Sequence, residues 1–285
     1  MDSRSIRFRW RLSNVSIAIV TDSTTTLTPE EQARPDIRVV PLTFHFGAEE
    51  TYVDKVDPSN AEFYQRLKES PDFPTTSQPP VGAFVEAYES LSDYDSILVL
   101  TISGVLSGTV ESARSAAGMV DVPVEVVDTK SAEFGSALIL RRTLAVVDGG
   151  GTFEEAKRAA EQAARRSDIY FAVGTLEYLA KSGRIGRAQK LFGSALDIRP
   201  ILTLVDGEVH PHKRVRGRKR QMSALVERLL PYVAEGRDFY FGHIDAEAAA
   251  RELADRLGVE NAEFSEIGGV VGCHVGPGAF GVACL

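Results

Sequence analysis

The chain has 285 residues, of which 44% are hydrophobic and 25% charged, and its formal net charge is -8. These values are typical of a globular protein with one large or two modest domains, and the negative charge argues against a general nucleic-acid-binding protein. The two cysteines, Cys273 and Cys284, cannot form a disulfide framework or a structural zinc site alone, so we expect a reducing, cytoplasmic environment. Because no apolar run reaches about 18 residues, we expect neither a membrane-spanning helix nor a secretion signal.

The first 14 residues form a basic leader that carries Arg4, Arg7, Arg9 and Arg11. We expect this leader to be disordered and to lie outside the fold, although it could serve as an arm that contacts an anionic surface.

Residues 15–166 repeat a pattern of apolar strand, polar loop and helix. Short apolar runs at 15–20, 96–100 and 124–127 are typical of buried parallel strands, and a helical pattern follows each polar loop. This pattern predicts an N-terminal α/β domain with a mostly parallel sheet and helices on both faces. The polar loops at 22–26, 103–109 and 128–131 should therefore emerge at one edge of the sheet.

Two hydroxyl-rich loops are candidates for an anion site. Residues 101–109 follow a predicted strand and precede a helix, which is where open α/β sheets bind ligands, and they contain Ser103, Gly104 and Ser107. The loop at 75–80 holds Thr76 and Ser77 beside two prolines that stiffen the backbone. Each loop also has a purely structural interpretation, as a capped helix start and as a proline-stopped connection.

From residue 167 the pattern changes. Strands at 198–205 and 209–215 are joined by a tight turn, a helix is predicted over 184–196, and later strands and helices alternate to the end. We predict a C-terminal α+β domain over residues 167–285, with much antiparallel pairing. The ligand is expected in the cleft between the two domains.

Basic residues gather in this second half, among them Arg184, Arg214, Arg216 and Arg218. A solvated charged face is the usual explanation for such a run. The functional alternative is docking of an acidic protein partner. Nucleic acid is a weaker alternative because no aromatic residues are interleaved for base stacking.

The glycine-rich segment at 268–281 contains His274. Its last part matches G-x-G-x-x-G, but too few residues follow for a dinucleotide site, so the glycines are expected to allow a close backbone approach. His274 could be a structural hydrogen-bonding residue or a ligand-binding one.

No serine-hydrolase elbow or phosphate-binding loop is present, and His210 and His212 are the only close pair of candidate metal ligands. Hydroxyls and one imidazole suit holding an anion better than transforming it.

The sequence resembles the DegV family through a series of short motifs in order across residues 15–285. These are Val20-Thr21-Asp22-Ser23, Thr76-Ser77-Gln78-Pro79, Leu106-Ser107-Gly108-Thr109, Val127-Asp128-Thr129, Leu176-Glu177-Tyr178-Leu179 with Gly183-Arg184-Ile185, Arg199-Pro200-Ile201-Leu202 and His274-Val275-Gly276-Pro277-Gly278. The resemblance implies a two-domain α/β protein that encloses one long-chain fatty acid in a buried tunnel. It also implies a non-catalytic subunit, without metal or cofactor, that presents the carboxylate to a separate fatty acid kinase subunit. The acyl phosphate then feeds phospholipid synthesis, and transient contact with a membrane surface is compatible with this role.

The resemblance also assigns roles to residues. Thr76, Ser77, Ser103, the backbone of Gly104 and His274 would bind the ligand carboxylate, and Arg184, Arg214, Arg216 and Arg218 would dock the kinase subunit. Family members often have a second serine where Gly104 stands and a second glycine where Ser182 stands.

Two other functions stay open on the sequence. One is a small hydrolase or acyltransferase that uses Ser103 or Ser107 with His274. The other is a transcriptional or protein-binding module that senses lipid through its basic face.

Overall fold

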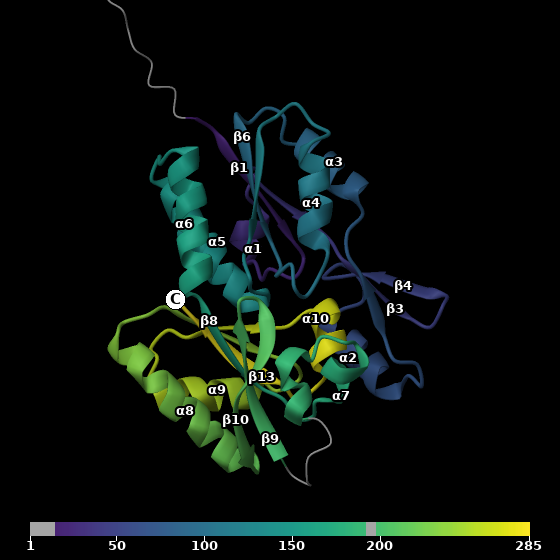
Figure 1. The fold of residues 1–285 in the computed structure, drawn as a ribbon, viewed down its shortest axis with the longest axis vertical. Helices are drawn as coiled ribbons and strands as arrows, with labels where there is room; N and C mark the ends of the chain where they lie inside the picture. Colours follow the sequence, from purple (N-terminus) through teal and green to yellow (C-terminus); the bar gives the residue numbers. More distant parts are fainter. Residues whose placement is uncertain (1–14, 192–197) are drawn as a thin grey trace, which may run out of the picture.

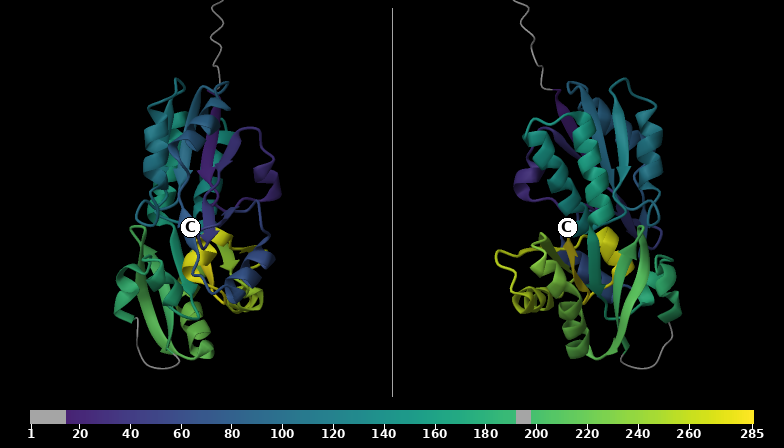
Figure 2. Two further views of the ribbon diagram at one scale, coloured as in Figure 1. Left: turned by 90° about the vertical axis from the view of Figure 1, so that its right-hand side faces the viewer. Right: turned by 60° about the vertical axis from the view of Figure 1, so that its left-hand side comes forward.

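The computed structural model of the chain describes residues 15–191 and 198–285. Its elements form two bodies, one above the other along the longest axis, and the turned views show the same division (Figure 1, Figure 2). The basic leader predicted for residues 1–14 lies outside the described residues. The helix predicted over 184–196 is described only in part, as a 3-10 helix, η1 (Gly186–Leu191).

The upper body is built on a parallel sheet of four strands in the order β2-β1-β6-β7. These strands are β1 (Ile17–Asp22), β2 (Ile37–Val40), β6 (Ser96–Thr101) and β7 (Val124–Asp128). Every residue of β1 and β6 is buried, which explains why their sequences are continuous apolar runs instead of alternating ones. The predicted parallel sheet is confirmed.

Helices cover both faces of this sheet. Ala18 and Val20 of β1 pack with α3 (Val81–Glu89) and α4 (Thr109–Ala117), whereas Ile17 and Ile19 face α5 (Glu133–Asp148) and α6 (Phe153–Arg166). The short α1 (Pro29–Gln32) precedes β2. The polar loops after β1, β6 and β7 meet at one edge, where Ile102 N–H donates to the Asp22 carboxylate and Ser103 N–H donates to the Ser131 carbonyl.

The lower body contains a mixed sheet of six strands in the order β10-β9-β8-β13-β11-β12. Its strands are β8 (Asp168–Ala172), β9 (Ile198–Val205), β10 (Glu208–Arg216), β11 (Phe239–His243), β12 (Glu263–Glu266) and β13 (Phe280–Cys284). All neighbouring pairs are antiparallel except β11 with β12, so the predicted antiparallel pairing is confirmed. Helices α8 (Arg218–Ala234) and α9 (Glu247–Leu257) pack on one face, and α5 packs on the other.

A small third sheet comes from the first half of the chain but packs with the second. It has the order β4-β3-β5, with β3 (Thr43–Phe46), β4 (Glu50–Val53) and β5 (Thr75–Ser77), and α2 (Asn60–Glu69) lies between β4 and β5 in sequence. Phe44 and Phe63 share one buried cluster with Val270 and Cys273. The predicted boundary after residue 166 falls between α6 and β8, yet residues 43–77 pack across it. A division of the chain at that single point therefore stays a prediction.

The glycine-rich segment near the C-terminal end forms a helix, α10 (Gly269–Val275), where no helix was predicted. Its glycines let the helix lie directly on aromatic rings. A Cβ at Gly269 would come within 2.6 Å of Phe44 Cε1, and one at Gly272 within 2.8 Å of Phe63 Cε1. The close backbone approach expected from the glycines is present, and its partners are the rings of β3 and α2.

Candidate ligand cavity

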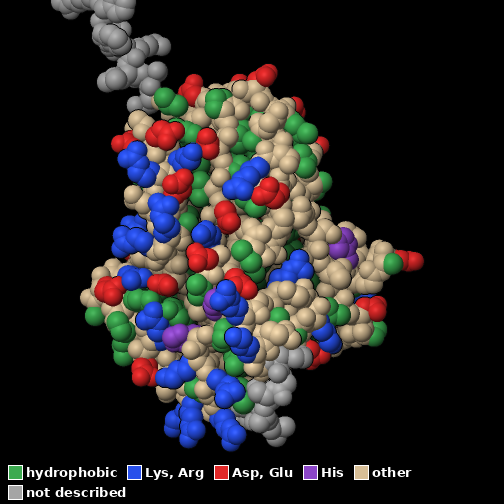
Figure 3. All heavy atoms as spheres, in the orientation of Figure 1, with side chains coloured by type: hydrophobic (Ala, Val, Ile, Leu, Met, Phe, Trp, Pro, Cys, Tyr) green, Lys and Arg blue, Asp and Glu red, His purple; other side chains and the backbone are tan. Residues whose placement is uncertain are grey.

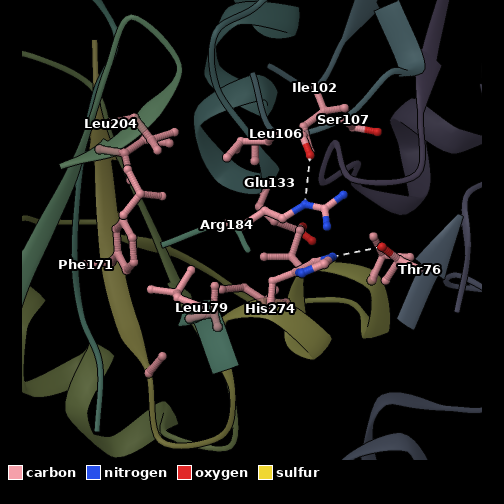
Figure 4. Close-up of a pocket in the computed structure, with 18 of the residues that line it drawn as sticks. Thr76, Ile102, Leu106, Ser107, Glu133, Phe171, Leu179, Arg184, Leu204 and His274 are labelled. Carbon is pink, nitrogen blue, oxygen red and sulfur yellow. Dashed lines mark hydrogen bonds between the residues drawn. The ribbon is translucent and has the colours of Figure 1, made fainter. Parts of the chain in front are cut away.

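A cavity lies where the edge of the parallel sheet meets the lower body and α10 (Figure 4). The loops after β6 and β7, the strands β8 to β10, α10 and α7 (Glu177–Lys181) contribute to its wall. Most of the lining is apolar: Leu42, Ile102, Leu106, Phe134, Ile169, Phe171, Leu179, Leu204, Val209, Ala279 and Phe280, besides the residues of α10. An apolar wall of this kind suits the hydrocarbon part of an amphipathic ligand.

Helix α10 presents one stripe of side chains to the cavity. Val270, Val271, His274 and Val275 line it, and their spacing of three and four residues is that of one helical face. Ile267, just before the helix, lines the cavity as well. The glycines of α10 lie on the opposite side against the aromatic cluster. One face of the helix therefore lines the cavity with side chains, and the other face, which carries the glycines, packs closely against aromatic rings.

Thr76 and His274 form a polar pair in the wall of the cavity. Thr76 Oγ1 lies 2.9 Å from His274 Nε2, at hydrogen-bond distance, and Figure 4 shows the two side chains pointing toward each other. Thr76 is the middle residue of β5, so the side chains of Thr75 and Ser77 point to the other face of that strand. Ser77 is exposed there, with its Oγ 2.9 Å from His45 Nε2. The structure therefore brings Thr76 and His274 together and places Ser77 elsewhere.

The imidazole of His274 is neutral at ordinary pH. Burial, together with the nearby positive charge of Arg184, lowers the pKa of His274 to about 4. Its Nδ1 is buried and has no hydrogen-bond partner in the described part of the chain. Because a neutral imidazole donates from one nitrogen and accepts at the other, His274 can support Thr76 and still offer a polar atom to a ligand.

Arg184 reaches across the cavity from the segment after α7. Its Nε donates to the Leu106 carbonyl at 3.3 Å and its Nη1 to the Ser182 carbonyl at 2.7 Å (Figure 4). The side chain is exposed and also lines the cavity. A cation at this position lies between the cavity and solvent.

The loop after β6 contributes to the cavity at its start, through Ile102, and again in its second half. Ser107 and Gly108 line the wall, whereas the Ser103 hydroxyl donates to the Gly207 carbonyl at 2.9 Å, at the turn between β9 and β10. Gly104 is exposed and, like Ser103, is not among the described lining residues. A carboxylate role for Ser103 stays a prediction, and it would require this hydroxyl to leave Gly207.

A buried carboxylate also faces the cavity. Glu133 lines the wall, is 3% exposed, and its Oε2 accepts from Lys55 Nζ at 3.1 Å and from Thr26 Oγ1 at 2.9 Å. Burial raises the pKa of Glu133 above its usual value, and the Lys55 ammonium opposes that rise. The backbone of Glu133 has φ of 48°, in the left-handed region that favours glycine, which marks a residue held in place by its surroundings.

The predicted docking residues do not form one cluster. Arg187 Nε lies 3.2 Å from Glu208 Oε2, which places the Arg184 segment at the start of β10. Arg216 ends that strand eight residues later, roughly 26 Å away at the usual rise of a strand. Figure 3 shows Lys and Arg side chains gathered at that lower end, where β10 ends and α8 begins; the exposed residues there are Arg214, Arg216, Arg218, Lys219 and Arg220.

Within residues 15–191 and 198–285, no helix is long and apolar enough to cross a membrane. The same part of the chain contains no group of three or more His, Cys, Asp or Glu side chains arranged to hold a metal ion. Cys273 and Cys284 are both buried and unbridged.

Comparison with known proteins decides the family. A family model described as an uncharacterised protein of the DegV family matches residues 16–285. The chain belongs to the DegV family. A DegV domain-containing protein of Deinococcus radiodurans is 39% identical over 94% of this chain and 98% of its own length. A protein of Thermotoga maritima named fatty acid-binding protein is 35% identical over 94% and 96%.

Solved structures agree with this assignment to the DegV family. A family member from Thermus thermophilus, described by its fatty acid binding, superposes with a TM-score of 0.88 at 36% identity and covers 94% of this chain and 99% of its own. DegV of Bacillus subtilis, described as a fatty acid binding protein, has a TM-score of 0.85 at 31% identity over 95% and 99%. The resemblance seen in the sequence motifs, and the two-domain α/β fold that it implied, are therefore confirmed.

Sequence reasoning missed part of the cavity of this DegV-family chain. Gln78, Leu106 and Glu133 line it but were not predicted as site residues. The first two stand inside the quoted family motifs, so those motifs held a usable signal. No signal in the sequence marked Glu133, because a glutamate at the start of a helix is common. Only the fold shows that this side chain is buried.

Proposed function

We propose that this DegV-family protein binds one long-chain fatty acid in the cavity, with the carboxylate at Thr76 and His274. The observation that carries the proposal is a mostly apolar cavity whose wall contains a neutral hydroxyl–imidazole pair. The names of the relatives from Thermotoga maritima and Thermus thermophilus support it.

The energetics suit this arrangement. Burying a C16 chain contributes up to about 0.8 kcal/mol per CH₂, or roughly 12 kcal/mol before the costs of association and desolvation are subtracted. A carboxylate taken out of water costs several kcal/mol unless it is hydrogen-bonded. While it keeps its own hydrogen bond, the Thr76–His274 pair can supply one donor, either the Thr76 hydroxyl or the N–H at Nδ1 of His274. The hydrocarbon tail thus provides the affinity, and the polar pair fixes the orientation.

A neutral site also suits a carrier that passes the carboxylate on. We propose that a separate kinase subunit phosphorylates the bound fatty acid to an acyl phosphate in the cytoplasm, for phospholipid synthesis, and that this chain performs no catalysis and needs no cofactor. Arg184 at the cavity and Arg214, Arg216 and Arg218 at the far end of β10 are the proposed docking residues. The distance between these two groups favours a partner that contacts an extended surface.

The hydrolase alternative gains no support from the geometry. Ser103 donates to the Gly207 carbonyl, the Ser107 hydroxyl lies 2.9 Å from that of Thr109, and the Nε2 atom of His274 bonds to Thr76. A serine nucleophile would need a base at hydrogen-bond distance, which neither serine has in His274.

The test is denaturing extraction of the purified protein followed by mass spectrometry of the released lipid. We expect near-stoichiometric fatty acid of about C14 to C18, since the wall is apolar over most of its length. The variant Val271→Trp, which fills the cavity from α10, should release little or none. Leu230→Trp, on the exposed side of α8, is the matched control and should carry lipid like the natural protein. A natural protein that is empty and takes up no added fatty acid would refute the proposal.

A further inference from the structure

Glu133 carries a polar atom that the proposed function does not use. Its Oε2 is occupied by Lys55 and Thr26, but its Oε1 is buried and has no partner in the described part of the chain. The side chain belongs to the cavity wall and is 3% exposed. Because a buried polar atom without a hydrogen bond is costly, an unpaired oxygen in the wall of a binding cavity points to a group of the ligand.

The Glu133 carboxylate is held at the opposite end of α10 from the proposed head-group site. Its partner Lys55 packs at the start of α10, where a Cβ on Gly268 would lie 2.9 Å from Lys55 Cε. Asp54, next to Lys55, accepts from Val270 N–H at 3.1 Å. His274 lies in the last turn of the helix, six residues after Gly268, so roughly 9 Å of helix separates the two positions.

We propose that the cavity has a second polar subsite at Glu133, and that this subsite pairs with a hydroxyl group borne by the hydrocarbon chain of the ligand. This inference rests on the proposed function, because the head group must lie at Thr76 and His274 for the chain to reach Glu133. An extended chain advances about 1.2 Å per bond, so roughly 9 Å places the hydroxyl near the sixth to tenth carbon.

A hydroxyl fits this oxygen better than other polar groups do. It can donate to Oε1 when Glu133 is ionised and can accept from it when the carboxyl is protonated, so it is satisfied in either state. A second carboxylate would be repelled by an ionised Glu133 and would be desolvated as well. The subsite therefore selects a neutral hydroxylated chain.

The test measures how stearate and a series of monohydroxy-octadecanoic acids compete with a fluorescent fatty acid for the natural protein. We expect an isomer hydroxylated near the sixth to tenth carbon to bind at least as tightly as stearate. Isomers hydroxylated near the methyl end should bind about tenfold or more weakly, because their hydroxyl is buried without a partner.

Two variants identify the partner. In Glu133→Met the preferred isomer should fall about tenfold or more below stearate, whereas Glu133→Gln, which still offers a hydrogen bond, should preserve the preference. Stearate measured in the same variant is the internal control, and the isomer comparison in the natural protein decides the matter alone if a variant does not fold.

The outcomes separate the two proposals. If stearate binds but every hydroxylated isomer binds at least tenfold more weakly, or if Glu133→Met keeps the preference, the subsite is refuted and the fatty acid proposal stands. If neither stearate nor any isomer binds, the fatty acid proposal fails and the subsite falls with it.

Discussion

Two polar pairs, one neutral and one charged, differ in how they meet the cavity: both members of the neutral pair line it, whereas only the carboxylate of the charged pair does. Thr76 and His274 form a neutral pair, because burial and Arg184 keep the imidazole unprotonated. Lys55 and Glu133 form an ion pair in which the carboxylate is fully enclosed and the lysine is 26% exposed. The neutral pair is the better suited to an anion, because His274 Nδ1 has no partner in the described part of the chain. The charged pair would place the anion beside a carboxylate.

The two pairs should also respond to pH in opposite directions. The lowered pKa of His274 means that the unfolded chain takes up a proton before the folded one, so acidification through the range between about 6.5 and 4 destabilises the fold. The raised pKa of Glu133 means that the folded chain takes up its proton first, so acidification relieves the cost of a buried charge.

The largest effect is expected from removing Lys55. Lys55→Met leaves the Glu133 carboxylate without its cation and should lower the free energy of unfolding by about 3 kcal/mol at pH 8. The loss should narrow at pH 5, because Glu133 can then be protonated. Lys68→Met, which breaks an exposed pair with Asp245, should cost less than about 1 kcal/mol at either pH. Urea titrations of both variants measure this, and a loss from Lys55→Met that does not change with pH would contradict the assignment.

The next effect concerns His274. Relative to His274→Gln, which cannot be protonated in this range, the natural protein should lose about 2 kcal/mol of unfolding free energy between pH 7 and pH 5. Paired urea titrations at several pH values give the difference directly. Parallel pH profiles of the two proteins would mean that the imidazole is not held neutral.

A smaller effect is expected at the other member of the neutral pair. Thr76→Val removes the hydroxyl proposed to hold the carboxylate and should weaken fatty acid binding about tenfold, or roughly 1.5 kcal/mol. Thr75→Val is the matched control, since it is exposed on the other face of β5.

Ser77→Ala decides the role predicted for Ser77 from the sequence. Weakened binding would support that role, and unchanged binding would leave Thr76 as the contributor from this strand.

The smallest effects should come from the exposed arginines. Arg184→Gln and Arg216→Gln should each slow association with a purified fatty acid kinase catalytic subunit by a few-fold at low salt, and the difference should shrink as salt is raised. Arg165→Gln, on the exposed surface of α6 in the upper body, provides the control. Surface plasmon resonance at two salt concentrations measures the rates. Effects that match the control, or that persist at high salt, would remove these residues from the proposed docking surface.

The sequence predicted what depends on local pattern. The buried runs of β1 and β6, the polar loops at their ends and the tight turn at Asp206 and Gly207 were readable because strand burial and turn chemistry leave direct marks. His274 and Thr76 were singled out by the resemblance to the DegV family, and the structure brings them together.

What the sequence could not show depends on distant contacts. Helix α10 was missed because glycine has low helix propensity, and its stability comes from aromatic rings more than 200 residues earlier in the chain. The partner of Ser103 lies on the β9–β10 turn, and the ion-pair partner of Glu133 is Lys55, which is 78 residues away. A local sequence pattern shows none of these contacts, because each joins residues that are far apart in the chain.

The position of β13 has a consequence for the synthesis of the protein on the ribosome. Residues 280–284 occupy the middle of the six-stranded sheet, between β8 and β11, and without them the sheet is divided into a group of three strands and a group of two. The upper body, whose four strands end at residue 128, has every strand of its sheet long before β13 is translated. We therefore expect the nascent chain to fold in two stages, with the apolar faces that will enclose the cavity left uncovered until the second is complete.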